Sequence, residues 1–178
     1  MAKTYNTIGT FTAGAILTAA QMNEIGTNVN NYRVPPACRA YNNANITLAN
    51  ASGTILTLNS EDFDTDSMHS LTTNTERLTV TTPGIYVVSA EVKFDINAAG
   101  MRYIAIIKNA ATYVCDSSTP STGGGTFTEV NVTGLVSMAN GDYFSLYAYQ
   151  NSGGNLAARG NVTPNGVWLS AAWVGQVS

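Results

Sequence analysis

The stretch Arg77–Phe94, RLTVTTPGIYVVSAEVKF, decides the fold of this chain. In its first half Leu78 and Val80 alternate with threonines, which is the period-2 pattern of a half-buried strand. Pro83–Gly84 then interrupts the pattern, because proline lacks a backbone donor and glycine admits positive φ. In the second half, Tyr86–Phe94, apolar residues again recur at every second position. The stretch therefore predicts two strands of a β-sandwich, each with one face in the core.

Similar runs occur along most of the chain after residue 36, and turn-forming clusters rich in Gly, Pro, Asn and Asp separate them. Short strands at this spacing predict an all-β fold, a jelly-roll β-sandwich that spans residues 37–178. The predicted strands are Cys38–Tyr41, Ile46–Ala49, Thr54–Leu58, Arg77–Thr81, Ile85–Phe94, Met101–Lys108, Thr126–Val136, Tyr143–Gln150 and Val167–Val174.

The composition is poor in charge. Charged residues make up 11% of the 178 residues and the net charge is −3, against about 25% charged residues in ordinary globular domains. Nucleic-acid binding requires clustered Lys and Arg, so the composition argues against a nucleic-acid partner. The N-terminus has no apolar run long enough for an export signal or a membrane span, so we expect cytoplasmic synthesis and no membrane partner.

Residues 1–36 form a separate N-terminal arm and helix, before the jelly-roll domain. Thr18 and Gln21 stand three residues apart, as in a capping box, and Pro35 limits the helix at its other end. A single helix of this length is marginal by itself, so we expect it to anchor the protein or assist its assembly. Its apolar stripe, the predicted anchoring surface, consists of Met22, Ile25, Val29 and Tyr32.

Three of the predicted strands are apolar on both faces. In a two-layer sandwich only one face of each strand lies in the core, so the other face needs a cover. The simplest cover is another copy of the chain, and an uncharged face rich in Tyr and Trp is typical of an oligomer interface. The candidate core or trimer-interface residues are Tyr103, Ile104, Ile106, Tyr143, Tyr147, Tyr149, Trp168 and Trp173.

The order and spacing of short motifs between about residues 56 and 175 resemble the globular-head jelly roll of complement and tumour necrosis factor ligands. The segment is similar, in particular, to the form of this domain found in structural proteins of tailed bacteriophages. The matching pieces are Phe63-Asp64-Thr65-Asp66 with Met68-His69, Arg77-Leu78-Thr79-Val80, Pro83-Gly84-Ile85-Tyr86, Gly100-Met101-Arg102 with Lys108-Asn109, Gly134-Leu135-Val136, Gly141-Asp142-Tyr143, Tyr149-Gln150-Asn151-Ser152-Gly153-Gly154 and Trp173-Val174-Gly175.

The N-terminal phrases Thr12-Ala13-Gly14 and Leu17-Thr18-Ala19-Ala20-Gln21-Met22-Asn23 are similar to a leader of many phage virion proteins. The resemblance implies a homotrimer in the virion, assembled in the host bacterial cytoplasm, with the jelly roll outward and residues 1–36 bound to other virion proteins of the capsid or tail. Capsid decoration, head fibre and tail-associated component all fit this description. The alternative is a module that binds a host receptor or glycan through the loops Ser117–Phe127 and Asn151–Thr163.

The acidic segment Glu61–Asp66 is the one candidate metal site, with Asp64 and Asp66 as possible calcium ligands. It places four carboxylates within six residues, oxygen-rich clusters can hold Ca²⁺, and some relatives of the trimeric fold bind calcium. The segment lacks EF-hand spacing, and a solvated acidic turn is the more common arrangement, so we expect no cofactor. His69, the only histidine, has no partner at ligand spacing and is expected to have a hydrogen-bonded structural role.

Catalysis has little support in the sequence. A hydrolase triad would have to use His69, and no Gly-x-Ser-x-Gly turn is present, so we expect a protein that is not an enzyme. Cys38 and Cys115 could form a disulfide, but two free thiols are expected in a reducing cytoplasm.

Overall fold

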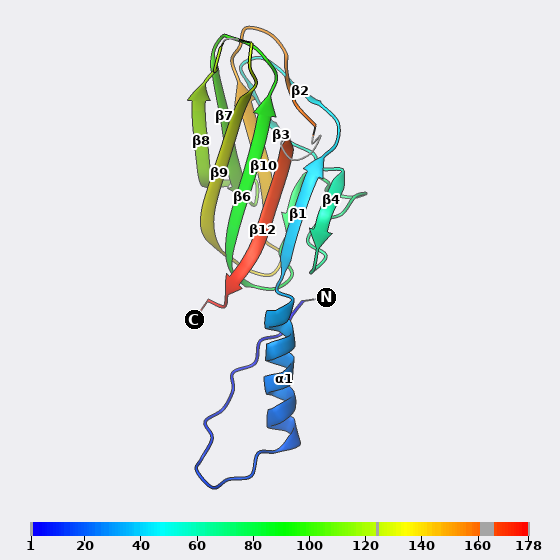
Figure 1. Ribbon diagram of the computed structural model, residues 1–178, viewed down its shortest axis with the longest axis vertical. Coiled ribbons are helices and arrows are strands. Elements are labelled where there is room, and N and C mark those ends of the chain that lie inside the picture. Colours follow the sequence, from blue (N-terminus) through cyan, green and yellow to red (C-terminus); the bar gives the residue numbers. More distant parts are fainter. Residues whose placement is uncertain (1, 124, 161–165, 178) are drawn as a thin grey trace.

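The computed structural model describes residues 2–123, 125–160 and 166–177. These residues form two stacked antiparallel sheets with one helix that projects from their lower end (Figure 1). The elements are α1 (Ala19–Arg33), β1 (Ala37–Asn42), β2 (Ile46–Leu48), β3 (Ser52–Ile55), β4 (Ser60–Asp64), β5 (Arg77–Thr79), β6 (Gly84–Phe94), β7 (Met101–Lys108), β8 (Thr112–Pro120), β9 (Thr128–Met138), β10 (Tyr143–Gln150), β11 (Leu156–Ala158) and β12 (Val167–Gly175).

The first sheet, called sheet A, has the strand order β2-β11-β6-β12-β1-β4, with β9 paired to β6. The second, sheet B, has the order β3-β10-β7-β8, with β5 paired to β10. The predicted jelly-roll sandwich is therefore confirmed. We call the end of the sandwich next to α1 the base, because β1 begins there and β12 ends there (Figure 1). In the described residues no helix is long and apolar enough to span a membrane.

The deciding stretch carries the chain from one sheet to the other. Its first strand, β5, pairs with β10 in sheet B, whereas its second strand, β6, pairs with β9 and β12 in sheet A. The predicted core face of β6 is confirmed, since every second residue from Tyr86 to Phe94 is fully buried. The Tyr86 hydroxyl donates a hydrogen bond to the Thr82 carbonyl oxygen at 2.6 Å, which fixes the connection between the sheets.

Gly84, in that connection, needs to be glycine for two reasons. Its φ of +153° is a conformation that L side chains rarely adopt, and a Cβ atom there would lie 2.1 Å from Trp173 Nε1. Trp173 is fixed in turn, because Nε1 donates a hydrogen bond to the Pro83 carbonyl oxygen at 3.2 Å.

Three strands of the structure were not predicted. β4 is acidic, β8 consists mostly of small polar residues, and β11 has only three residues, so none shows a clear apolar alternation. β4 and β8 are edge strands, paired on one side by β1 and β7 respectively. Edge strands bury little apolar surface, which explains why the hydrophobic pattern missed them.

We predict that Gly84→Ala lowers the free energy of unfolding by about 3 kcal/mol, because the new methyl group strains the backbone and displaces the Trp173 ring. Urea unfolding followed by tryptophan fluorescence measures this change. Gly175→Ala is the matched control in the neighbouring strand, since a Cβ there meets nothing within 4 Å. Equal free energies of unfolding for the two variants would contradict the requirement for glycine at position 84.

Candidate functional site

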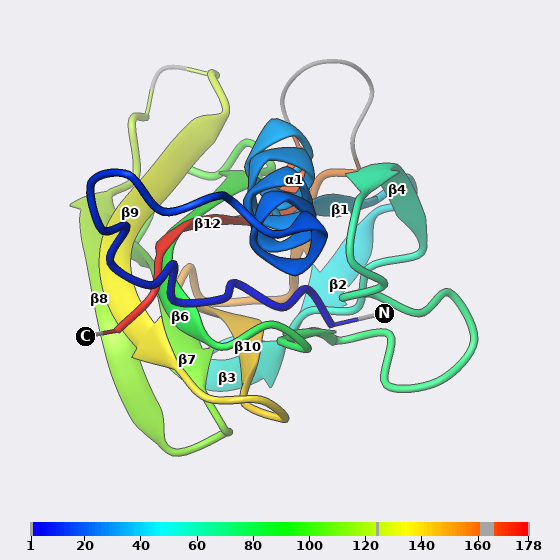
Figure 2. The same cartoon turned by 90° about the horizontal axis from the view of Figure 1, so that it is seen from below.

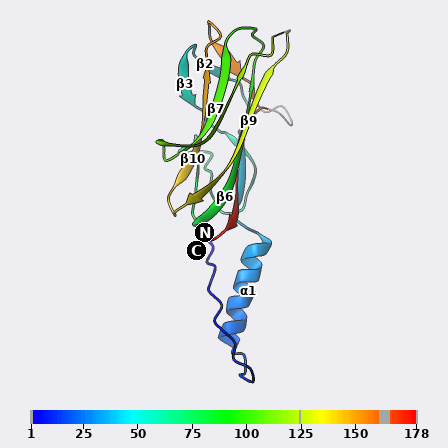
Figure 3. The ribbon, with the colours of Figure 1, turned by 90° about the vertical axis from the view of Figure 1, so that its left-hand side faces the viewer.

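The N-terminal hairpin, residues 2–33, is the part of the molecule that projects from the sandwich. The arm, residues 2–17, runs beside α1 from the base to the far end of the helix and turns back into it (Figures 1 and 3). The predicted capping box is present. The backbone N–H of Gln21 donates to the Thr18 hydroxyl oxygen, and the backbone N–H of Thr18 donates to Gln21 Oε1. The helix therefore begins where the sequence predicted.

Polar groups fasten the arm to the helix. The backbone N–H of Asn6 donates to Asn28 Oδ1 at 2.8 Å, and Asn28 Nδ2 donates back to the Asn6 carbonyl oxygen at 2.7 Å. One turn further on, Asn31 Nδ2 donates to the Thr4 carbonyl oxygen at 2.7 Å. Asn28 is the one buried residue of α1, so the face of the helix that is covered is polar.

Tyr5 joins the hairpin to the sandwich. Its ring stacks on Trp173 with 4.3 Å between centroids and 7° between planes, and lies 5.0 Å from the Tyr32 ring of α1. Gln176 Nε2 donates to the Tyr5 carbonyl oxygen, and the Lys3 amide donates to Thr82 Oγ1 at 2.8 Å. Burial raises the pKa of the Tyr5 hydroxyl above its ordinary value. Because α1 makes no extensive contact with any strand, this aromatic joint holds the helix in place.

The predicted anchoring stripe faces outward. Met22, Val29 and Tyr32 are 53%, 52% and 59% exposed, and Ile25 is half-buried beside the arm. The four residues share one side of α1. Tyr32 contacts the rings of Tyr5 and Trp173, whereas Met22 and Val29 stay largely exposed. The apolar surface of the helix is therefore available to a partner.

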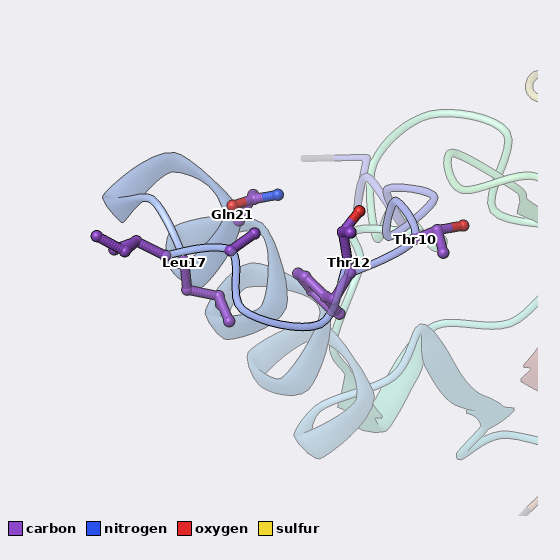
Figure 4. Close-up of a pocket in the computed structure, with 7 residues that line it drawn as sticks. Thr10, Thr12, Leu17 and Gln21 are labelled. Atoms are coloured by element: carbon purple, nitrogen blue, oxygen red, sulfur yellow. The ribbon is translucent and has the colours of Figure 1, made fainter.

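The far end of the hairpin, its tip, is also apolar. Ile8, Phe11, Ile16 and Leu17 are exposed there, Ile16 by 91%. No charged residue occurs between Lys3 and Glu24. Of the seventeen large apolar side chains exposed in the described residues, eight lie before residue 37. A small hollow in the tip (Figure 4) is lined by Thr10, Phe11, Thr12, Ala15, Ile16, Leu17 and Gln21.

A second exposed apolar surface lies on the outer face of sheet A near the base. Leu135 and Ala172 are the cross-strand neighbours of Val87 in β9 and β12. Leu135 is 67% and Val174 57% exposed. Farther from the base the same face becomes polar, with Ser89 hydrogen-bonded to Thr133 at 2.8 Å. We call the apolar part the base patch: Ile85, Val87, Leu135, Ala172 and Val174.

The predicted interface residues fall into three groups. Ile104 and Ile106 are fully buried in the core between the sheets. Trp168 lies half-buried on the outer face of sheet A, under the Arg39 guanidinium at 4.7 Å, and Trp173 is buried at the base against Tyr5. The remaining four, Tyr103, Tyr143, Tyr147 and Tyr149, are half-buried on the outer face of sheet B.

Tyrosine rings cover the outer face of sheet B. Tyr147 lies 6.1 Å from Tyr103 and 6.3 Å from Tyr113, in edge-to-face geometry, and burial raises the pKa of Tyr103 and Tyr147. Ala105 and Ile107, which share this face, are buried. The tyrosine rings therefore cover Ala105 and Ile107 within one chain but stay half-buried themselves, and their place in a trimer interface stays a prediction. We call Tyr103, Tyr113, Tyr147 and Tyr149 the tyrosine cluster.

The acidic segment is built into the structure and is not a solvated turn. Asp66 is only 2% exposed, and its Oδ2 accepts hydrogen bonds from the hydroxyls of Thr81 and Thr82 at 2.5 and 2.7 Å. Asp64 accepts from the backbone amides of Asp66 and His69. The described residues contain no group of three or more His, Cys, Asp or Glu placed to hold a metal. The carboxylates considered as possible calcium ligands therefore accept hydrogen bonds from the chain itself, except for the buried Asp66 Oδ1, and a calcium site stays untested.

His69 has the expected hydrogen-bonded role. Nδ1 lies 2.9 Å from Glu61 Oε1 and Nε2 lies 3.3 Å from the Thr75 carbonyl oxygen. Cys38 is a free thiol in the core, where burial is the main cause that raises its pKa, and Cys115 is a free, half-buried thiol.

The two loops expected to bind a glycan are partly strands. Residues 117–120 belong to β8 and residues 156–158 to β11. Residue 124 of the first loop and residues 161–163 of the second lie outside the described residues. The aromatic surface is on sheet B, where the sequence singled out Tyr143, Tyr147 and Tyr149 and favoured core or interface packing for them over glycan binding.

Comparisons with known proteins identify the fold. Three similar solved structures each have a TM-score of 0.55. Eiger TNF from S. frugiperda is 10% identical in sequence, and the match covers 81% of this chain and 96% of that one. The globular domain of zebrafish complement 1qA is 12% identical, with 80% of this chain and 100% of that one covered, and murine APRIL is 14% identical, with 78% and 98% covered. The fold is a TNF- and C1q-like jelly roll. No family model and no curated protein matches the sequence.

The predicted resemblance to this fold is thus confirmed. The shared part covers about four-fifths of the chain. At 10–14% sequence identity the three structures identify the fold alone, and the assignment to a phage virion stays a prediction.

We predict that Tyr5→Ala detaches α1 from the base, because it removes the ring between Trp173 and Tyr32. Amide hydrogen exchange across residues 19–33 should become faster, with a loss of protection of about 2 kcal/mol, while exchange in β6 is unchanged. Phe11→Ala, in the same arm but at the tip, is the control and should leave both regions unchanged. Unaltered amide exchange of α1 in Tyr5→Ala would show that other contacts hold the helix to the base.

Proposed function

We propose that this chain is a non-enzymatic structural protein of a tailed-bacteriophage virion. It forms a homotrimer whose jelly roll is displayed on the outside of the particle, as capsid decoration, head fibre or tail-associated component. The N-terminal hairpin binds other virion proteins, and the virion is assembled in the bacterial cytoplasm. The observation that carries this proposal is the hairpin itself, with its exposed apolar side chains and no charged residue between Lys3 and Glu24, at one end of the molecule.

The hairpin has the properties of a docking element. Exposure of apolar side chains such as Ile16 and Phe11 to water is unfavourable, and their burial against a partner stabilises the complex by about 25 cal/mol for each Å² covered. An exposed cluster of this kind usually marks a protein–protein contact. Its position at the base leaves the opposite end of the jelly roll free to face outward (Figure 1).

The non-enzymatic part of the proposal rests on His69. As the only histidine it is the one imidazole available as a general base, yet both of its ring nitrogens lie within hydrogen-bond distance of chain atoms. Its side chain is fully buried, so a substrate cannot reach it. The geometry expected of a catalytic base, with a nucleophile and an open cleft beside it, is not that of His69.

We predict that Ile16→Asp prevents incorporation into particles, because a charge at the tip cannot be buried against a partner. Particles of the phage that encodes the chain should contain at least about tenfold less of this variant, by quantitative immunoblot. Leu71→Asp places the same charge at an exposed apolar residue of the jelly roll and should be incorporated normally.

Both variants should keep the mass of three 18.7-kDa chains in analytical ultracentrifugation. Normal incorporation of Ile16→Asp would overturn the docking role of the tip. A monomer for the unsubstituted protein would overturn the trimer.

A second candidate function is recognition of a host glycan or receptor, and the tyrosine cluster favours it. Tyr113 is 53% exposed and Tyr103, Tyr147 and Tyr149 are half-buried, so four rings are accessible on one face. Aromatic rings stack on the apolar faces of sugars, and their hydroxyls provide polar contacts. Tyr147 lies flat across Gly53, where a Cβ atom would approach its hydroxyl to 1.8 Å, so the backbone is shaped to receive this ring.

For this second function we predict that Tyr147→Ala weakens binding of the labelled trimer to host cells by about tenfold. Periodate treatment of the cells, which oxidises sugar diols, should have a similar effect. Tyr41→Ala, which removes a half-buried tyrosine from the outer face of sheet A, is the control. Binding that depends on neither Tyr147 nor periodate would exclude a glycan at the tyrosine cluster.

A further inference from the structure

The exposed stripe of α1 has the spacing of a coiled-coil seam. Its residues, Met22, Ile25, Val29 and Tyr32, are separated by three, four and three positions. These are successive a and d positions of a heptad, the positions through which helices pack on copies of themselves. A helix that packs on the sheet of its own domain usually has a wider apolar face.

The arm leaves most of this stripe uncovered. Asn28 and Asn31, on the adjoining side of the helix, are occupied by hydrogen bonds to Asn6 and Thr4. Ile25, at the border, is half-buried by comparison with Met22 and Val29. The uncovered apolar surface of α1 is therefore limited to a and d positions, which is the width that one helix presents to its neighbours in a coiled coil.

Apart from its capping box, the helix has little stabilisation from its own sequence. It has 15 residues, with Gly26 in its interior, and isolated helices of this length are marginal in water. Within the chain it is held mainly by the arm and the Tyr5 joint. Packing along the stripe would supply the apolar contacts that the chain itself does not.

The surroundings indicate that the partner is another copy of the chain. Seen from the base, α1 lies toward the sheet A side of the molecule and the arm lies toward the sheet B side (Figures 2 and 3). The side of the helix away from the arm therefore lies on the same side of the molecule as the base patch. A second copy of the chain offers the same two apolar surfaces, the stripe and the base patch, in the same arrangement.

We propose that the stripe Met22, Ile25, Val29 and Tyr32 is the seam of a parallel three-stranded coiled coil, formed by α1 of three copies of this chain. This inference rests on the homotrimer of the proposed function and assigns the stripe to self-association, which leaves the tip of the hairpin for the particle. Tyr32 forms the layer nearest the base, where it also contacts Tyr5. The aromatic joint thus sets the direction in which each helix leaves its jelly roll.

Cysteine cross-linking of the purified full-length chain tests the seam directly. Val29→Cys is compared with Thr27→Cys, which lies on the opposite side of α1. Both variants also carry Cys115→Ser, which removes the partly accessible native thiol, whereas Cys38 is kept because it is fully buried. Under mild oxidation Val29→Cys should form a disulfide between two chains at least about tenfold faster than Thr27→Cys, because neighbouring seam thiols have a high effective concentration. One chain of each trimer should stay unlinked.

A second pair of variants checks the energetic contribution of the seam. Ile25→Asp with Val29→Asp should lower the helical circular dichroism signal and speed amide exchange in α1, whereas Asn23→Asp with Thr27→Asp should not. Equal cross-linking of Val29→Cys and Thr27→Cys in a protein that is still trimeric would overturn the seam and leave the proposed function standing. Fast linking of Val29→Cys in a chain that is absent from particles would support the seam and overturn the virion role.

Discussion

The stack of Tyr5 on Trp173 is the contact on which the arrangement of this molecule depends. The jelly roll folds around its own core, and the N-terminal helix has little apolar contact with it. One aromatic ring, placed between Trp173 of β12 and Tyr32 of α1, connects the two parts. Without that ring the helix would keep only the direct contact of Tyr32 with Trp173, at 5.8 Å between centroids, the chain that leads into β1 and the polar contacts of the arm.

The same base holds several buried or half-buried polar groups that act together. Asp66 accepts from Thr82, Thr82 accepts from the Lys3 amide, and Tyr86 donates to the Thr82 carbonyl oxygen. A segment first considered as a metal site is therefore part of the connection between the arm and the sandwich. The chemistry of its carboxylates is used for structure, since a buried acceptor with hydroxyl donors supports the loop before β6.

Local patterns in the sequence predicted the main strands, the capping box and the stripe of α1, because strand alternation and helix capping involve residues close in the chain. They could not predict which side of the helix is covered. That depends on Asn6 meeting Asn28, a polar pairing across 22 residues with no apolar periodicity. For the same reason the burial of Asp66 was not foreseen, since its partners Thr81 and Thr82 belong to a different part of the chain. The tyrosines of β7 and β10 were identified as apolar, but only the fold shows that they cover their own sheet.

This self-covering of sheet B has a consequence for the order of events in assembly. Since Ala105 and Ile107 are already shielded within one chain, a single copy exposes few core residues and can complete its domain before it meets another. Association of copies into the proposed trimer is then a step between finished domains, and its rate depends on protein concentration. Newly made chains would stay separate at low abundance and combine only once synthesis has raised their number.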